Sequence, residues 1–291
     1  MPDTMRARLV RTRATAPDAV CTAAANRPRG PELARRGRFL LIAADHPARA
    51  SLTVRGRANA MADRVDLLDR LLVALSRPGV AGVLGTADIL EDLLLLDALA
   101  NKIVVGSMNR GGVPGTVFEI DDRFTAYDAD TITAMRFDAG KMLLRIDPDD
   151  PATAGALERC SQAVSALAAR QLVSMVEPFW VRRDAAGARV NDLSTDAVIR
   201  SVAVAQALGS RSAYTWLKLP VVDDMPRVLA ATTLPVVLLG GDPHGDPDRT
   251  YAAWQRALTD ESVRGLVVGR ALLYPPDDDV AAAVDTAVGL L

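Results

Sequence analysis

The feature that most constrains the fold is a series of eight short apolar runs, each followed by a stretch with a helical pattern. The runs occupy residues 39–44, 80–85, 102–107, 141–146, 172–178, 212–222, 234–241 and 263–270. Continuous apolar runs are typical of strands buried on both faces, as in parallel sheets. Eight strand–helix units within about 250 residues predict a (β/α)8 TIM barrel, of class α/β.

A doubly wound open sheet is the alternative architecture. It would normally place a glycine-rich fingerprint after the first strand, but Asp45, His46 and Pro47 stand there. We expect the barrel to cover residues 38–291. Residues 1–37 are rich in Arg, Ala, Thr and Pro, and we expect a loose or partly helical extension, with a mitochondrial-type presequence as the alternative.

The composition narrows the class of protein. The net charge of −2 gives no indication of nucleic acid or an anionic membrane as a partner. No run of about 20 apolar residues occurs, and the N-terminus lacks the apolar core of a signal peptide. Cys21 and Cys160 do not resemble a disulfide framework. We therefore expect a cytoplasmic homo-oligomer that acts on a small molecule.

Lysine is rare in this chain, and its positions are informative. Among 34 Lys and Arg residues only Lys102, Lys141 and Lys218 are lysines, and each lies in or at the start of an apolar run. Burial lowers a lysine pKa and frees the amine to attack a carbonyl, whereas arginine stays charged. We predict that Lys218 forms an imine, with a salt-bridged structural lysine as the alternative. Strand alternation would put Trp216 on the same face as Lys218.

Other candidate residues follow from the place of the active site in a TIM barrel, at the C-terminal ends of the strands. Lys141 is a second cation whose field would favour the neutral form of Lys218. Glu177 or Asp45 is suited to proton transfer. An aldolase that works without a metal needs this combination of an amine and a proton carrier.

A phosphate site is predicted after the seventh and eighth strands, the usual place in a TIM barrel. Gly240, Gly241 and Gly269 would expose backbone N–H groups, and Arg270 would add charge. A tight turn is the alternative for the glycine pair. Further candidates for substrate binding follow other strands or lie on them: His46, Asn109, Arg110 and Arg145.

The histidine count bears on metals. The chain has two histidines, His46 and His244, whereas a metal-dependent aldolase usually needs about three histidine ligands. We therefore predict no metal and no other cofactor. For His46 itself, a capping or core histidine is the structural alternative.

These strand ends resemble the archaeal-type class I fructose-bisphosphate aldolases, through Asp45, the lysine of the sixth strand, and GG and GR on the last two strands. The strings AGKMLLRIDPDD (139–150), VEP and KLPVVDDM are more similar to class I tagatose-bisphosphate aldolases. The strongest resemblance is to aldolase-like barrels of high-G+C bacteria that are often encoded with inositol-catabolism genes. It rests on AADHPAR, SMNRGG, YTWLKLP and LLGGDP at 43–49, 107–112, 214–220 and 238–243.

The resemblance, which covers about residues 38–291, implies a class I aldolase. In the tagatose-type family the residues matching Lys141 and Glu177 line the site, and the one matching Lys218 forms the imine. The implied substrate is a phosphorylated keto-sugar or keto-sugar acid, with dihydroxyacetone phosphate as the ketone product. The inositol association implies 6-phospho-5-dehydro-2-deoxygluconate, with malonate semialdehyde as the aldehyde.

Three alternatives remain open at this stage: a deoxyribose-phosphate-type aldolase, another imine or acyl-transfer reaction, and a non-catalytic sugar-phosphate-binding barrel. Two departures from the families matter. The archaeal-type enzymes have a tyrosine where this chain has Glu177, which the tagatose-type resemblance covers. Asp242 and Pro243 directly follow the glycine pair, and a carboxylate beside a phosphate is repulsive. Asp242 favours the binding barrel, whereas the three lysines oppose it.

Overall fold

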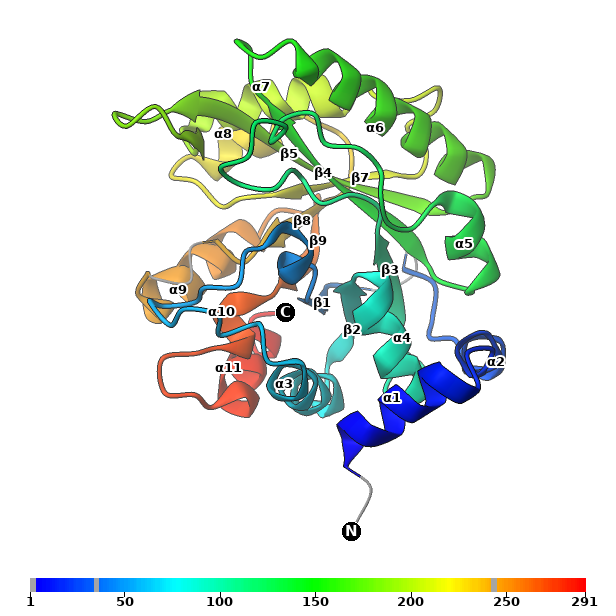
Figure 1. Ribbon diagram of the computed structural model, residues 1–291. Coiled ribbons are helices and arrows are strands. Elements are labelled where there is room, and N and C mark those ends of the chain that lie inside the picture. The colour runs from blue at the N-terminus through cyan, green and yellow to red at the C-terminus, as the bar shows by residue number, and fades with distance from the viewer. Residues whose placement is uncertain (1–3, 34–36, 242–244) are drawn as a thin grey trace.

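Eight parallel strands close into a barrel in the computed structural model, which describes residues 4–33, 37–241 and 245–291 (Figure 1). The strands are β1 Phe39–Ala43, β2 Val80–Gly85, β3 Ile103–Ser107, β4 Ala139–Ile146, β5 Val173–Arg183, β7 Thr215–Leu219, β8 Val236–Leu239 and β9 Val263–Val268. Each pairs with the next, and β9 pairs with β1. The predicted (β/α)8 TIM barrel is confirmed, and the open-sheet alternative is wrong because the sheet has no edge.

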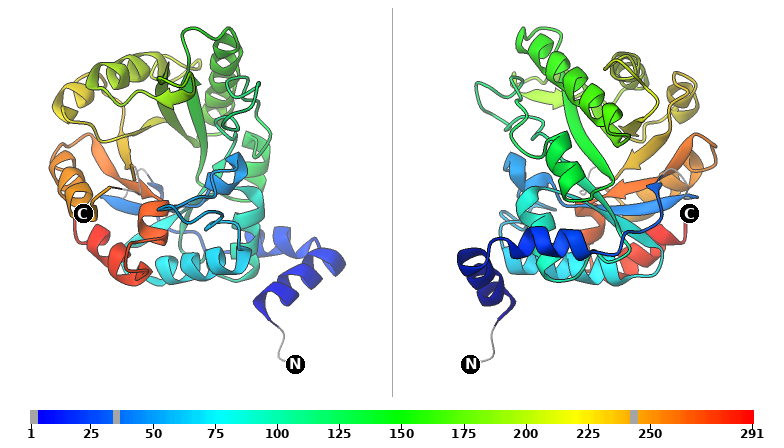
Figure 2. Two further views of the ribbon diagram at one scale, coloured as in Figure 1. Left: turned by 60° about the vertical axis from the view of Figure 1, so that its left-hand side comes forward. Right: turned by 90° about the vertical axis from the view of Figure 1, so that its right-hand side faces the viewer.

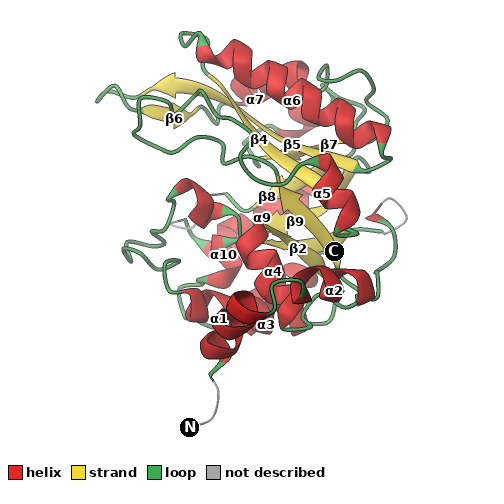
Figure 3. Cartoon of the chain, turned by 45° about the vertical axis from the view of Figure 1, so that its right-hand side comes forward, coloured by secondary structure: helices red, strands yellow, loops and turns green. Residues whose placement is uncertain are grey.

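Helices surround the strands on the outside (Figures 2 and 3). They are α3 Arg64–Ser76, α4 Ala87–Leu95, α5 Ala129–Ala134, α6 Ala152–Ala169, α7 Thr195–Ala205, α8 Met225–Leu229, α9 Pro247–Ala257, α10 Arg270–Leu273 and α11 Val280–Val288. Short polar side chains begin several of them: Asp63 accepts hydrogen bonds from the first turn of α3, and Ser194 does so for α7. Within the described ranges, no helix has both the length and the apolar character needed to span a bilayer.

Strand alternation divides the core into two layers. Leu217 and Leu219 pack outward among the helices, whereas Trp216 packs inside the barrel. The Trp216 ring lies 6.1 Å from that of Phe39, centroid to centroid. Lys218 takes the next inward position on β7, because side chains two residues apart share a face of the strand. The alternation predicted from the sequence therefore holds for this strand.

Strand β5 is longer than the sequence predicts. It continues past Pro178 to Arg183 and then pairs antiparallel with a short strand, β6 Arg189–Asn191. Proline normally ends pairing in a central strand because it has no N–H group. Here β7 pairs with β5 only as far as Val176, so Pro178 lies where one side of the strand has lost its partner. The extension forms a hairpin that rises above the barrel.

The N-terminal extension carries two helices, α1 Met5–Thr15 and α2 Ala19–Asn26, which lie beside α4 (Figure 1). Leu9 and Val20 are buried. Arg13 is held by two carboxylates of α4, at 3.0 Å from Glu91 and 2.9 Å from Asp92. The described part of the extension is thus packed against the barrel. The division at residue 37 into an extension and a barrel stays a prediction.

Candidate functional site

Four ionisable side chains meet at the C-terminal end of the barrel: Asp45 after β1, Lys141 on β4, Glu177 on β5 and Lys218 on β7. We call them the mouth cluster. Lys218 Nζ donates a hydrogen bond to Glu177 Oε1 at 2.9 Å. Lys141 Nζ lies 2.7 Å from both Asp45 Oδ2 and Glu177 Oε2. Glu177 therefore bridges the two lysines.

The two contacts of Glu177 differ in quality. Its contact with Lys218 has the geometry of a hydrogen bond. Its contact with Lys141 is a close ion pair through Oε2, at 2.7 Å. Each oxygen of an ionised carboxylate has two lone pairs, so Oε2 can contact Lys141 and still accept a proton.

Charge, more than burial, sets the protonation of the cluster. Burial alone would raise the pKa of Glu177, but the Lys141 and Lys218 charges outweigh it and lower that pKa to about 2. Burial would likewise raise the pKa of Asp45, and Lys141 lowers it well below its usual range. Burial opposes the charge of Lys141, yet Asp45 and Glu177 raise its pKa above the usual value.

The cluster therefore contains two carboxylates that stay ionised and a lysine, Lys141, that stays an ammonium. The sequence predicts that burial and the positive field of Lys141 both favour the neutral form of Lys218. In the structure that field is offset by Glu177, which lies against both amines. Glu177 is thus placed to accept a proton from Lys218.

A cavity of about 450 Å³ opens above the cluster. Lys141, Glu177 and Lys218 form part of its wall. The next inward-facing side chains, Leu143 and Phe179, pack with Leu239 into an apolar collar around it. A collar of this kind limits water around the amines and strengthens electrostatic interactions there. The third lysine, Lys102, precedes β3 at the opposite end of the barrel.

The residues predicted to bind phosphate line the same cavity: Gly240, Gly241, Gly269 and Arg270. Arg270 begins α10, and its Nη1 lies 3.5 Å from Ser51 Oγ. Gly269 has a steric reason to be glycine, because a Cβ there would stand 2.3 Å from the Ala43 carbonyl oxygen. The end of β9 can therefore approach the end of β1 closely.

His46 also lines the cavity. Burial lowers its pKa to about 3, so the ring is neutral at physiological pH. Its Nδ1 lies 3.8 Å from Asp45 Oδ1 and has no hydrogen-bond partner among the described residues. Asp242, Pro243 and His244, to which the sequence drew attention, lie outside the described residues.

Three predicted binding residues lie away from the cavity wall. Asn109 is buried and fixes the backbone of Leu143, donating to its carbonyl at 2.7 Å and accepting from its N–H at 2.8 Å. Arg110 donates to the Ala48 carbonyl at 2.6 Å. Arg145 is buried and pairs with Glu119. Their contacts with a substrate stay predictions.

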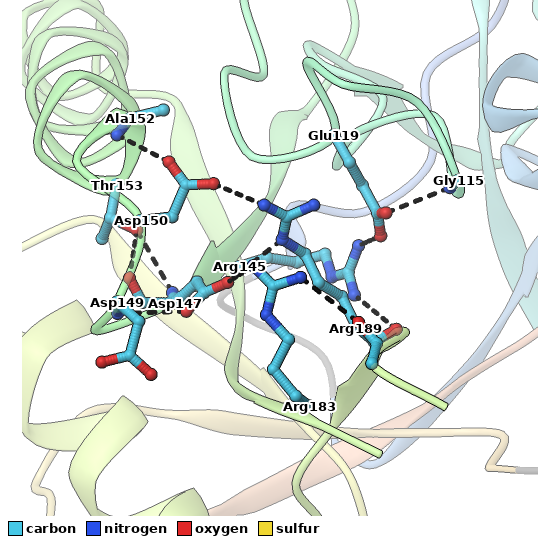
Figure 4. A network of polar contacts seen from close by, with 11 residues as sticks. Gly115, Glu119, Arg145, Asp147, Asp149, Asp150, Ala152, Thr153, Arg183 and Arg189 are labelled. Atoms are coloured by element: carbon cyan, nitrogen blue, oxygen red, sulfur yellow. Dashed lines mark hydrogen bonds and ion pairs between the residues drawn. The ribbon is translucent and has the colours of Figure 1, made fainter. Parts of the chain in front are cut away.

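Arg145 belongs to a second group of charges, shown in Figure 4. Glu119 pairs with Arg145 and accepts from the Gly115 N–H at 3.0 Å. Arg145 Nη2 lies 3.5 Å from the Arg189 carbonyl oxygen. Arg189 binds Asp147 at 3.1 Å and Asp150 at 2.6 Å. This rim network, as we call these five charged side chains, ties the loop before α5, the end of β4 and the β5–β6 hairpin together.

The sequence prediction does not include several residues that line the cavity: Arg49, Ser51, Phe179, Asn191 and Leu193. Arg49 stands in the string at 43–49, and that proximity to Asp45 is the only signal for it. Asn191 reaches the cavity on the β5–β6 hairpin, so only a prediction of that hairpin could have identified it. Asp184 and Gly187, which lie in the turn, are the sequence signal for the hairpin. Across the described ranges, no group of three or more His, Cys, Asp or Glu side chains is arranged to hold a metal ion.

Comparison with known proteins gives a family model and a set of solved structures. The model described as Cgl0159-like matches residues 37–288. The crystal structure of Cgl0159 from Corynebacterium glutamicum is 52% identical, with 100% of this chain and 97% of that chain covered and a TM-score of 0.95. No curated protein matches the chain.

More distant structures include archaeal aldolases. An archaeal fructose 1,6-bisphosphate aldolase is 17% identical, with coverage of 93% of this chain and 98% of that chain and a TM-score of 0.63. A second archaeal fructose-1,6-bisphosphate aldolase, with its catalytic lysine covalently bound to the carbinolamine intermediate, is 16% identical, with coverage of 93% and 98% and a TM-score of 0.63. At such identities the similarity shows a shared fold.

Proposed function

The chain belongs to the Cgl0159-like family, and we propose that it is a class I aldolase, a carbon–carbon lyase that acts through an imine on Lys218. The substrate class is a phosphorylated keto-sugar or keto-sugar acid. One observation carries the proposal: Lys218 is buried in the cavity wall and hydrogen-bonded to Glu177. A lysine next to a base is the arrangement that imine formation requires.

The reaction begins with proton transfer from Lys218 to Glu177, which leaves a neutral amine. The amine nitrogen adds to the substrate ketone to give a carbinolamine. Protonated Glu177 returns its proton to the carbinolamine hydroxyl group, which leaves as water, so that an iminium ion forms and Glu177 is again ionised. A base then removes the proton of the hydroxyl group two carbons from the iminium carbon. The bond between this hydroxyl-bearing carbon and the carbon next to the iminium carbon then breaks. An aldehyde leaves, and the bonding electrons form an enamine. Protonation of the enamine carbon and hydrolysis release the ketone and restore Lys218.

Glu177 is the base in this scheme. It is ionised before the reaction, because its pKa is lowered to about 2, and it already contacts Lys218. Its Oε2 contacts Lys141 at 2.7 Å and has a second lone pair with which it can take up a proton. Lys141 keeps its charge and stabilises both carboxylates, while Asp45 holds Lys141 in place at 2.7 Å.

The phosphate of the substrate is assigned to the cavity wall formed by Gly240, Gly241, Gly269 and Arg270. Backbone N–H groups and a guanidinium are typical phosphate ligands at this place in a TIM barrel. Dihydroxyacetone phosphate would then be the ketone product. The carbinolamine captured on the catalytic lysine of the archaeal aldolase of the same fold supports the chemistry by analogy.

Within this class, 6-phospho-5-dehydro-2-deoxygluconate is the candidate substrate, which would place the protein in inositol catabolism. This choice is supported by sequence resemblance alone. The partner in this proposal is a small phosphorylated sugar, and no metal or other cofactor is required. A cytoplasmic location and a homo-oligomeric state stay predictions.

The proposal is tested by turnover. The purified protein is incubated with 6-phospho-5-dehydro-2-deoxygluconate, with deoxyribose 5-phosphate and with fructose 1,6-bisphosphate, each with and without a strong chelator. We expect release of a ketone or aldehyde product from one of them, unchanged by the chelator. Binding of the sugar phosphates without any product would identify a non-catalytic barrel. Activity that the chelator abolishes and zinc restores would contradict an imine mechanism.

A further inference from the structure

Arg49 is a charged residue of the cavity wall that the scheme above leaves unused. It ends a short 3-10 helix, η2 His46–Arg49, and is half-buried. Among the described residues, its guanidinium group forms no hydrogen bond and no ion pair. Arginine cannot lose its charge to relieve this, and a partly desolvated charge without a partner is unfavourable. An anion in the cavity would satisfy it.

The cavity has positive charge at two separate places. Arg270 follows β9, the neighbour of β1 on one side, and its charge acts on His46. Arg49 lies toward the opposite side, because Arg110, which follows β3, donates a hydrogen bond to the carbonyl of the neighbouring Ala48 at 2.6 Å. The charges that act on Arg49 include Arg145 of β4 and Glu177 of β5. Since β4 and β9 are reached from β1 in opposite directions around the barrel, a ligand in the cavity would meet one guanidinium group at each end.

The two ends differ in the anion that they suit. The Arg270 end has three glycines of the cavity wall beside it, and backbone N–H groups of such glycines are suited to a phosphate. The Arg49 end offers the planar guanidinium group of Arg49 and the side chain of Asn191, whose NH2 group can donate a hydrogen bond to an anion. A guanidinium fork matches a carboxylate through two parallel hydrogen bonds.

The charges around Arg49 point the same way. Besides the Arg145 guanidinium, three carboxylates act on Arg49: those of Glu177, Asp45 and Asp122. Their negative charge would repel a phosphate dianion about twice as strongly as a carboxylate monoanion, because the Coulomb energy is proportional to the charge. The Arg49 end is therefore better suited to a single negative charge.

We propose that Arg49 binds a carboxylate on the aldehyde half of the substrate, so that the enzyme is specific for phosphorylated keto-sugar acids. This inference rests on the proposed imine function. Phosphate at Arg270 places the ketone half over Lys218, and the aldehyde half then extends past Glu177 toward Arg49. Asn191 contributes its amide group to the same carboxylate.

The test compares two substrates that differ only at this end. One is a six-carbon 5-keto acid 6-phosphate with a hydroxyl at C3, and the other has a primary alcohol in place of the carboxylate. The ratio of their kcat/KM values is measured for the wild type, Arg49→Gln, Arg49→Lys and Arg182→Gln. Arg182 is an exposed arginine on the β5–β6 hairpin outside the cavity wall, so its variant controls for the loss of one charge.

We expect the wild type to prefer the acid and Arg49→Gln to reduce that preference about tenfold to a hundredfold, as for loss of a charge-assisted hydrogen bond. Arg49→Lys should recover part of it, and Arg182→Gln should retain it. A wild type without preference, or an Arg49→Gln variant with an unchanged ratio, would overturn the inference. Borohydride trapping of dihydroxyacetone phosphate on the wild type separates the carboxylate specificity at Arg49 from the imine function of Lys218. If trapping fails, the imine function itself is wrong.

Discussion

The mouth cluster and the rim network are both groups of buried charges at the ends of β4 and β5, yet they are built from different cations. Lys141 and Arg145 lie four residues apart on the same strand. Lys141 pairs with Glu177 in the cavity wall, and Arg145 pairs with Glu119 outside it. Lysine can give up its proton, whereas arginine stays charged at any physiological pH.

This difference suggests a division of labour. In the mouth cluster, Glu177 contacts two amines, so a proton can move between side chains without leaving a charge unpaired. In the rim network every guanidinium charge is permanent, and its carboxylates hold separate segments in place. We therefore expect an isosteric change in the mouth cluster to lower mainly kcat, and an isosteric change in the rim network to lower mainly the free energy of unfolding.

The largest effect should come from Glu177→Gln, which keeps the shape of the side chain but removes the base. General acid–base catalysis typically contributes about 10²–10⁴-fold, so kcat should fall by that factor. The urea midpoint should fall by less than in the rim-network change described next, because a lysine, unlike an arginine, can lose its proton when a carboxylate partner is removed. Steady-state kinetics and urea unfolding on the same sample check both statements. A variant with wild-type kcat would remove Glu177 from the mechanism.

Glu119→Gln is the matched change in the rim network, and its effect should fall on stability. It leaves the Arg145 guanidinium buried without its carboxylate, which typically lowers the free energy of unfolding by about 3–5 kcal/mol. Because Glu119 lies outside the cavity wall, kcat of the folded fraction should stay within a few-fold of the wild type. If Glu177→Gln proves the more destabilising of the two, the contrast between lysine and arginine clusters is wrong.

Arg270→Ala should act on binding more than on chemistry. Phosphate contacts are similar in the ground state and the transition state, so KM should rise while kcat changes little. Loss of one charge-assisted hydrogen bond, about 1.5–3 kcal/mol, corresponds to a rise of about tenfold to a hundredfold. Arg182→Ala serves as the control. An unchanged KM for a phosphorylated substrate would move the phosphate to another part of the cavity.

The smallest effect is a pH dependence of stability. The pKa of Glu177 is depressed from 4.5 to about 2 in the folded protein. Its contribution to the free energy of unfolding is therefore complete above about pH 4.5 and is lost as the pH falls toward 2. Glu177→Gln should unfold with a shallower dependence on pH in that window than the wild type does. Identical slopes would mean that Glu177 is not held ionised by the two lysines.

Much of the fold was accessible from the sequence, because eight apolar runs leave few ways to bury every strand on both faces. The exceptions are local. Pro178 predicts the end of a strand. The structure shows why β5 can continue past it: the pairing of β5 with β7 already ends at Val176, so the missing N–H group of Pro178 costs no hydrogen bond to β7. The resulting hairpin, which brings Asn191 to the cavity, depends on a long-range arrangement that no local pattern encodes.

The residues of the candidate site could be predicted from the sequence where a reactive side chain lies at the C-terminal end of a strand. Rare lysines in apolar runs pointed to Lys141 and Lys218, and both line the cavity. The sequence could not tell which of the nearby arginines turn inward. Arg145 follows the inward face of β4 but is captured by Glu119 from a loop, whereas Arg49 reaches the cavity from a 3-10 turn without strand periodicity. Side-chain partners from distant segments decide such cases.

The central claim is that Lys218 is the nucleophile, and reductive trapping tests it most directly. The protein is treated with dihydroxyacetone phosphate and borohydride, and the modified residue is located by peptide mass spectrometry. We predict one covalent adduct per chain, on Lys218, and none in a folded Lys218→Arg variant, which keeps the charge but cannot form an imine. An adduct on Lys141 or Lys102, or a mass gain that persists in Lys218→Arg, would contradict the claim.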